Sequence, residues 1–172
     1  MKPLILTTLL MSLMYSGLSI AQSCNRNMLA DTPDSRYSLK TDGTAIDKKT
    51  GLTWMRCALG QTWSAGTCKG TAKLYRWKSA LQAAESAVFA GQGNWRLPNI
   101  KELHSLVEYR CVDSAINLTA FPNTGELYWS SSPLRGNERD FALAWTISFV
   151  YGDENAGSAE DSNIVRLVRG GL

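Results

Sequence analysis

A run of basic side chains without acidic neighbours is the pattern in this 172-residue chain that most clearly points to chemistry. No carboxylate occurs between Asp47 and Glu85, whereas that interval contains Lys48, Lys49, Arg56, Lys69, Lys73, Arg76 and Lys78. Arginine forks and lysine point charges bind sulfate and phosphate groups. The candidate polyanion site therefore comprises Lys69, Lys73, Arg76 and Lys78, with Arg135 and Arg139 from a later loop. A solvated basic surface is the alternative interpretation.

Trp63 is the tryptophan whose setting best suits contact with a ligand. It lies near Gly66 in a segment bracketed by Cys57 and Cys68, whereas the other five tryptophans fall in strand or helix patterns. An exposed indole can stack on a sugar or anchor a protein contact. A core position for Trp63 is the alternative.

Acidic residues cluster towards the other end of the chain, at Asp153, Glu154, Glu160 and Asp161. The chain is therefore electrically asymmetric, although its formal net charge is only +3. Asp153, Glu154 and Asp161 offer the oxygen ligands that Ca²⁺ takes, and a solvated loop is the alternative. We predict no metal and no cofactor, and leave calcium as an open question.

The potential catalytic residues are few. The single histidine, His104, stands in a helical pattern one turn before Glu108, which is an ordinary surface spacing. Ser130, Ser131 and Ser132 lack the G-x-S-x-G turn that exposes a nucleophile, so hydroxyl packing in a strand is expected. We therefore do not predict an enzyme.

The four cysteines predict two disulfides, because their number is even and the protein is expected to be exported. Of the three possible pairings we favour Cys57–Cys68, which closes a short glycine-containing loop, with Cys24–Cys111 as the remainder. A four-cysteine zinc site is the alternative, but no CxxC spacing supports it.

The first residues have the features of a secretory signal. Lys2 precedes an apolar run, Leu4 to Leu13, and Ser19-Ile20-Ala21 offers a cleavage site. We expect a signal peptide over 1–21 and one domain over 22–172. No second apolar run reaches the ~20 residues of a membrane span, so we expect a protein of the periplasm or cell surface.

The periodicity of the remaining chain predicts one α+β domain. We expect a small antiparallel meander over 36–55, a disulfide-tied loop over 56–74 and a helix over 77–90. A short strand and a second helix, capped by Asn99 and Glu102, are expected over 94–109. An irregular stretch over 113–124, a strand over 141–149, a loop over 151–163 and a last strand over 164–168 complete the pattern.

Several motifs, in this order, resemble the Lcl C-terminal domain family. They are TDGTAIDKKTGLTWMRC (41–57), WKSALQAAE (77–85), NWRLPNIKELHSLVEYRC (94–111), INLTAFPNT (116–124), YWSSSP (128–133) and NIVRLVRGG (163–171). The family is named for the collagen-like adhesin of Legionella. The resemblance implies a C-type-lectin-like fold with two central helices, small antiparallel sheets and long loops, distantly related to the formylglycine-generating enzymes. It further implies that both chain ends meet in one sheet.

The best-known member is an adhesin whose domain binds sulfated glycosaminoglycans and forms trimers. This chain lacks the collagen-like repeat, and also the free cysteines and histidines that oxidase relatives use for copper or iron. We therefore expect a non-catalytic, adhesin-like module for glycans or sulfated polyanions. A periplasmic protein-binding module, such as an inhibitor or immunity protein, is the alternative. A nucleic-acid partner is not expected, and the oligomeric state stays open.

Overall fold

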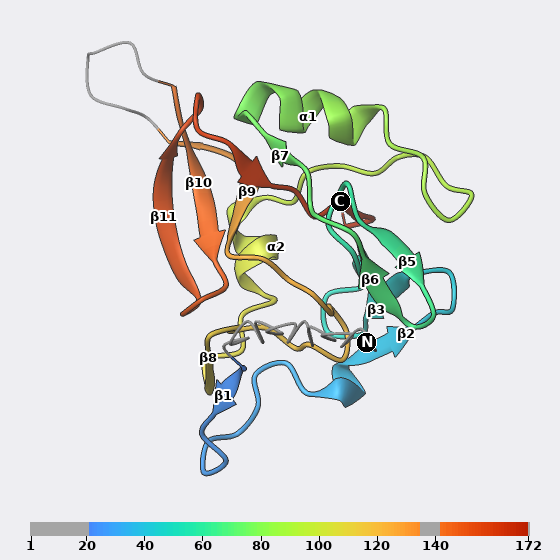
Figure 1. Cartoon of the computed structure of the whole chain (residues 1–172), viewed down its shortest axis with the longest axis vertical. Coiled ribbons are helices and arrows are strands. Elements are labelled where there is room, and N and C mark those ends of the chain that lie inside the picture. Colours follow the sequence, from blue (N-terminus) through green and yellow to red (C-terminus); the bar gives the residue numbers. More distant parts are fainter. Residues whose placement is uncertain (1–20, 135–141, 172) are drawn as a thin grey trace, which may run out of the picture.

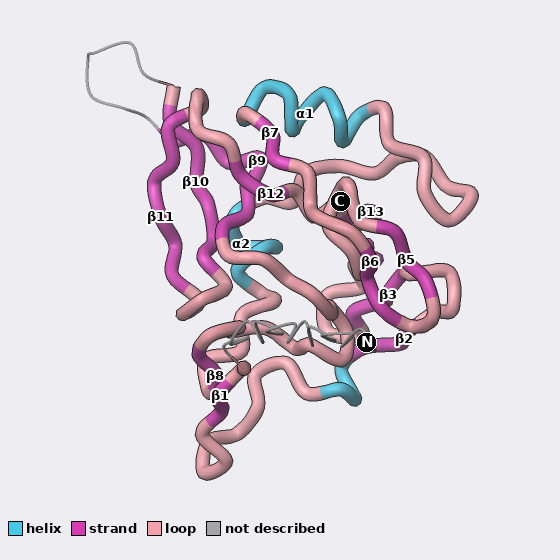
Figure 2. The backbone as a smooth tube through the Cα atoms, in the orientation of Figure 1, coloured by secondary structure: helices cyan, strands magenta, loops and turns pink. Residues whose placement is uncertain are grey.

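The computed structural model describes residues 21–134 and 142–171, which form an α+β arrangement of short strands, two small helices and long connections (Figures 1 and 2). Two sheets of five and four strands carry the architecture, and two two-stranded pairs lie beside them. The predicted α+β class is confirmed.

The four-stranded sheet has the order β13-β4-β3-β2 and is antiparallel throughout. Its first three strands form the predicted meander: β2 (Tyr37–Leu39), β3 (Thr44–Asp47) and β4 (Thr53–Met55). In β3 the residues Thr44, Ala45 and Asp47 are buried, whereas the more apolar Ile46 is only partly so. The buried carboxylate of Asp47 forms an ion pair with the buried Arg36.

The five-stranded sheet has the order β11-β10-β9-β12-β7. Its strands are β7 (Leu74–Tyr75), β9 (Leu127–Leu134), β10 (Leu143–Ser148), β11 (Asp153–Ser158) and β12 (Asn163–Ile164). The predicted loop over 151–163 is therefore wrong, because six of its residues pair with β10. This strand has no apolar alternation, since it is an exposed edge whose position is fixed by its neighbour.

Strand β10 departs from the simple alternation expected for a half-buried strand. Ala144 and Thr146 are fully buried, as is Ile147. The register with β9 shifts between Ala144 and Thr146, and such an irregularity resets which side chains face the core. The side chain of Trp129 also needs Gly157 opposite, since a Cβ there would lie 2.8 Å from its ring.

Helix α1 (Trp77–Glu85) is shorter than predicted, and α2 (Ile100–His104) follows a capped start. The predicted helix over 77–90 included Val88, which lies beyond the end of α1 and is 78% exposed. Asn99 and Glu102 form the predicted reciprocal cap, in which each side chain accepts from the other residue's backbone N–H. Leu103, Leu106 and Val107 are buried as the apolar spacing indicated.

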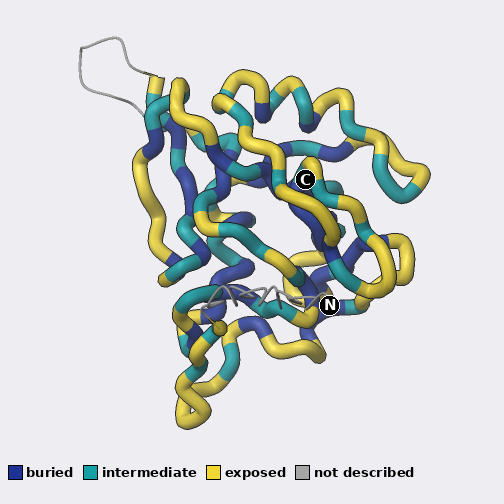
Figure 3. Tube along the Cα trace, in the orientation of Figure 1, coloured by how far each residue is buried: buried dark blue, intermediate teal, exposed yellow. Residues whose placement is uncertain are grey.

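The last predicted strand is divided between the two sheets. Ile164 in β12 pairs with β7 and β9, whereas β13 (Val168–Arg169) pairs with β4. The residues between them cross the interior, where Val165, Arg166 and Leu167 are fully buried (Figure 3). A single strand over 164–168 was therefore an incomplete prediction, because the chain changes sheets there.

Both favoured disulfides are present, Cys24–Cys111 and Cys57–Cys68. The first joins β1 (Ser23–Cys24) to β8 (Cys111–Val112), which pair antiparallel. The second ties the hairpin of β5 (Thr62–Ser64) and β6 (Thr67–Lys69), a pair of strands that we predicted as loop. In the chain-entropy model these links stabilise the fold by about 4.6 and 3 kcal/mol, respectively.

Candidate functional site

The basic candidates lie along a continuous stretch of the chain that runs from the end of β6 through β7 to the first turn of α1 (Figure 1). Lys69, Lys73 and Lys78 are all exposed. None of the three forms an ion pair with any residue in the ranges 21–134 and 142–171. We call these three residues the lysine strip.

Arg76, unlike the three lysines, forms an ion pair with a described residue. Its guanidinium lies 3.0 Å from the Glu160 carboxylate, in the connection between β11 and β12. The sequence interval around Arg76 has no acid, but the five-stranded sheet brings one to it from 84 residues further along the chain. Both side chains are largely exposed, so this pair reduces the local positive charge and adds little stability.

Arg135 and Arg139, the other two members of the predicted site, lie outside the described residues. The site is therefore considered below without them.

Trp63 is half-buried against the meander rather than freely exposed. Its indole N–H donates to the Thr41 carbonyl at 2.9 Å, and the Arg56 guanidinium lies 4.0 Å from its ring centroid. A Cβ on Gly43 would lie 2.7 Å from the same ring, so the turn before β3 packs directly against it. The ring fastens the disulfide-tied hairpin to the four-stranded sheet.

Trp63 also lines a groove of about 520 Å³. Lys40, Thr41 and Ser64 supply polar groups at this groove, and Leu39 lies beside them. Lys69 does not line this groove. In the hairpin Trp63 pairs with Cys68, whereas Lys69 pairs with Thr62. Because neighbouring residues of a strand point to opposite faces, Trp63 and Lys69 lie on opposite faces of the hairpin. The predicted residues thus form two neighbouring features, the groove and the lysine strip. Sequence reasoning missed Lys40, which has no distinguishing spacing.

Three arginines are buried and serve the interior. Arg36 makes a two-pronged ion pair with the buried Asp47 at 2.8 and 2.5 Å. Arg56 donates to the carbonyls of Ala120 and Thr119 at 2.8 and 2.7 Å. These contacts hold irregular segments together and leave little of either guanidinium for a ligand.

Arg166 is fully buried, between the two sheets, and no carboxylate among the residues described pairs with it. It donates to the carbonyls of Met55 and Arg56 and to the Thr124 hydroxyl. The ring of Phe121 lies 4.8 Å from its guanidinium carbon. Burial lowers the pKa of Arg166. Carbonyl dipoles and aromatic faces therefore replace the missing anion.

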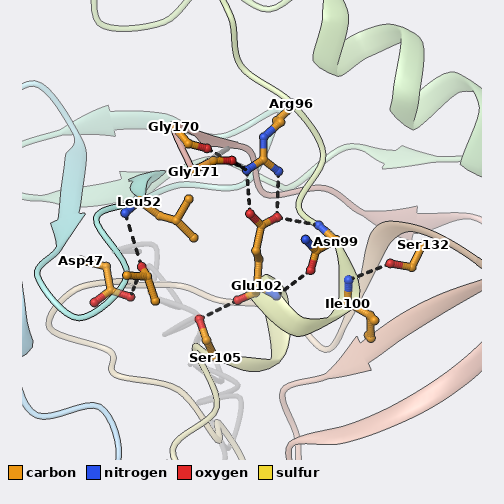
Figure 4. A network of polar contacts seen from close by, with 11 residues as sticks. Asp47, Leu52, Arg96, Asn99, Ile100, Glu102, Ser105, Ser132, Gly170 and Gly171 are labelled. Carbon is orange, nitrogen blue, oxygen red and sulfur yellow. Dashed lines mark hydrogen bonds and ion pairs between the residues drawn. The ribbon is translucent and has the colours of Figure 1, made fainter.

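Arg96 fastens α2 to the end of the chain, as Figure 4 shows. Its two terminal nitrogens lie 2.7 and 2.6 Å from the carboxylate oxygens of Glu102, and one of them also donates to the Gly170 carbonyl at 2.8 Å. Burial alone would raise the pKa of Glu102, but hydrogen bonds from Arg96 and the Asn99 backbone outweigh it and lower that pKa. This network is a structural clamp.

The residues considered for catalysis have structural partners. Ser130 is buried and its hydroxyl donates to the Trp145 carbonyl at 2.7 Å, and Ser132 Oγ accepts from the Ile100 N–H at 2.9 Å. His104 contacts Glu154 through Nδ1 and the Tyr109 hydroxyl through Nε2, and the ring is about a third exposed. Sequence spacing gave no sign of this last cluster, because Glu154 comes from β11.

The acidic residues considered for calcium are separated. Asp153 and Glu154 are adjacent in β11, so their side chains point to opposite faces. Asp161 accepts a hydrogen bond from the Ser158 N–H at 3.0 Å within its own turn. In the part of the chain that the structure describes, no group of three or more His, Cys, Asp or Glu residues is arranged to hold a metal ion.

The fold and its surface are those of a disulfide-linked α+β domain with an exposed basic strip. The model of the Lcl C-terminal domain matches residues 43–169, well over half of the chain, and the protein therefore belongs to that family. The resemblance seen in the sequence motifs is confirmed. No curated protein matches the chain. Among the described helices, none has the length and apolar character needed to cross a bilayer.

Proposed function

We propose that this protein is an exported, non-catalytic binding module of adhesin type that recognises sulfated or otherwise anionic glycans. The observation that carries the proposal is the lysine strip, in which Lys69, Lys73 and Lys78 are exposed and unpaired among the described residues. Cations that no carboxylate neutralises attract polyanions and bind their sulfate groups. Membership of the Lcl C-terminal domain family supports an adhesin-like role.

The groove at Trp63 supports a glycan rather than a simple anion as ligand. Its volume of about 520 Å³ lies within the range of small-molecule sites, and it combines an indole edge with the hydroxyls of Thr41 and Ser64. Lys40 adds a cation at the same groove. Trp63 and Lys69 lie on opposite faces of the hairpin, so a chain of sugar units that used both features would pass around the edge of the hairpin, with one ring at the groove and its anionic groups along the lysine strip.

The scaffold proposed for this module is C-type-lectin-like. The pairing of β13, the last strand, with β4 of the early meander supports this assignment, because both ends of the family domain then share one sheet. The two disulfides support export to an oxidising compartment.

Chromatography on immobilised heparin at several salt concentrations tests the proposal. The wild-type protein should be retained at low salt and elute earlier as salt screens the contacts, with weak retention above about 0.15 M. The variant Lys69→Gln/Lys73→Gln/Lys78→Gln should elute at clearly lower salt.

The matched control is Lys48→Gln/Lys49→Gln/Lys101→Gln, which removes the same charge from exposed lysines away from the strip. It should elute close to the wild type. Identical elution of the two variants would show that net charge alone, and not the strip, causes retention.

The alternative function, a protein-binding module such as an inhibitor or immunity protein, is favoured by exposed apolar side chains at the β8 end of the domain. Tyr109, Val112 and Tyr151 are 52%, 41% and 60% exposed. A single stoichiometric partner that stays bound at high salt would support this alternative over the glycan.

A further inference from the structure

We infer that the free edge of β11 is a docking site for an extended basic peptide segment, which adds to the five-stranded sheet as a further strand. The inference is independent of the lysine strip, because it concerns the opposite edge of the molecule and a partner of opposite charge.

Strand β11 is the outermost strand of the sheet order β11-β10-β9-β12-β7, and it lies at the outer edge of the sheet in Figure 1. Its first four residues, Asp153 to Ala156, are all exposed, as the yellow stretch of Figure 3 shows. No strand among residues 21–134 and 142–171 pairs with this edge, so it offers backbone donors and acceptors to an extended chain that approaches it.

The register with β10 shows which backbone groups face outward. Ala159 N–H donates to the Ala142 carbonyl, just beyond the paired residues Leu143 and Ser158. Because ladder bonds alternate along an antiparallel pair, the bonds to β10 come from Gly157, Asn155 and Asp153. The N–H and C=O groups of Glu154 and Ala156 therefore point to the open edge.

The charge along this edge selects a basic partner. Asp153 and Glu154 lie on opposite faces of the strand, so a cationic side chain on either face of an added strand meets a carboxylate. Burial, and then the carboxylates of Glu154, Asp31 and Asp153, raise the pKa of Tyr109. Arg110, next to Tyr109 in the chain, lies 3.5 Å from the carboxylate of the buried Glu108.

Aromatic rings beside the edge complete the site. Tyr109 is linked to the strand through His104, which contacts Glu154, and Tyr151 lies two residues before the start of β11. Both tyrosines are more than half exposed. Tyrosine faces attract lysine and arginine side chains, so the rings and the carboxylates favour the same chemistry in a partner.

The test uses the whole chain and a fluorescently labelled hexapeptide in which lysine and valine alternate. Fluorescence anisotropy should show binding that a glutamate–valine peptide does not reproduce. The same lysine–valine peptide, methylated on alternate backbone nitrogens, should bind at least about tenfold more weakly, because its outward N–H groups can no longer pair.

Two protein variants locate the site. Ala156→Pro should reduce peptide affinity at least about tenfold while leaving the ladder to β10 intact, because proline at an edge removes only an outward N–H. Asp153→Lys/Glu154→Lys should have a similar effect through charge. The control Asp42→Lys/Glu85→Lys makes the same charge change at exposed residues outside β11 and should bind normally.

Equal binding of the methylated and unmethylated peptides would overturn strand addition. Unchanged affinity in the β11 variants would place the peptide elsewhere, and no binding of the lysine–valine peptide would also overturn the inference. The heparin experiment does not depend on any of these outcomes, since the lysines of the strip lie at the end of β6, just before β7 and in α1.

Discussion

The interior between the two sheets and the surface from β6 to α1 both carry positive charge, but they use different residues for different purposes. In the interior, Arg36, Arg56 and Arg166 are buried and bind one carboxylate and several backbone carbonyls. On the surface, every lysine among the described residues is exposed and none forms an ion pair. The fold thus separates structural cations from available ones.

This difference follows from the chemistry of the two side chains. A guanidinium presents five donors in a rigid plane and can serve several carbonyls of irregular chain at once, which long loops require. An ammonium is strongly hydrated and is expensive to bury, so it remains at the surface. The number of cations in this sequence therefore overestimates how many are available at the surface, whereas the number of lysines comes closer to it.

The largest expected effect comes from breaking the buried pair. Asp47→Ala leaves Arg36 buried without its partner and should destabilise the protein by about 3–5 kcal/mol. Glu85→Ala, which removes an exposed carboxylate at the end of α1, is the control and should cost far less. Urea unfolding measures both, and equal losses would contradict a special role for the interior pair.

The unpaired interior cation gives the next largest effect. Arg166→Met removes the charge but leaves the Met55 and Arg56 carbonyls without a donor, so a loss of about 2–3 kcal/mol is expected. Arg166→Lys should not restore stability, because an ammonium cannot reach all of these acceptors in the same plane. A methionine variant more stable than the wild type would mean that burying the guanidinium costs more than its contacts contribute.

The clamp that Arg96 forms between α2 and the chain end is intermediate between the buried arginines and the exposed lysines, since Arg96 is partly exposed. Arg96→Lys keeps the charge and loses the two-pronged contact with Glu102, and about 1 kcal/mol is expected after allowing for solvent screening. The comparison is with Lys101→Arg, at an exposed position of α2, and the midpoints of thermal unfolding of the two variants are measured. No difference between the two variants would argue against the clamp.

Acid should destabilise the protein through Asp47 and Glu102, whose carboxylates accept several hydrogen bonds. Burial would raise the pKa of Asp47, but hydrogen bonds from Arg36, Thr50 and the Lys49 backbone outweigh burial and lower that pKa. The hydrogen bonds from Arg96 and the Asn99 backbone lower the pKa of Glu102 in the same way. In the folded protein the pKa values of Asp47 and Glu102 lie below their ordinary values of 3.8 and 4.5. The two ionised carboxylates therefore stabilise the fold fully at a pH above the ordinary values, and this contribution is lost as the pH falls through the pKa values of the folded protein.

The midpoint of thermal unfolding should therefore fall as the pH drops below about 4.5, within the ordinary range of glutamate. Glu102→Gln should show a smaller part of this dependence than the wild type. An identical pH profile for the two proteins would show that Glu102 does not contribute.

The smallest expected effect on stability comes from the surface. Lys69→Gln/Lys73→Gln/Lys78→Gln should change the free energy of unfolding by less than about 0.5 kcal/mol, because exposed unpaired lysines contribute little to folding. The same variant should elute from heparin at clearly lower salt, so an effect on binding without an effect on stability is expected here. A large loss of stability would show that these lysines contribute to folding, as the buried arginines do.

Much of the local structure could be predicted from the sequence. The capping pair Asn99 and Glu102, the meander of β2 to β4 and both disulfides depend on spacing along the chain, and all are present. Strand β11 could not be predicted, because its residues are polar and it is a strand only through pairing with β10. The division of residues 164–168 between two sheets likewise has no local signal.

The sequence by itself determined the family, the cap of α2, the four cysteines and an interval of chain free of acids. Only the tertiary structure decided which cations in that interval are available, since it placed Glu160 beside Arg76 and Arg56 under Trp63 and left Lys69, Lys73 and Lys78 exposed. The physical reason is that charge interactions depend on distance in space, and the fold brings together residues that the chain keeps far apart.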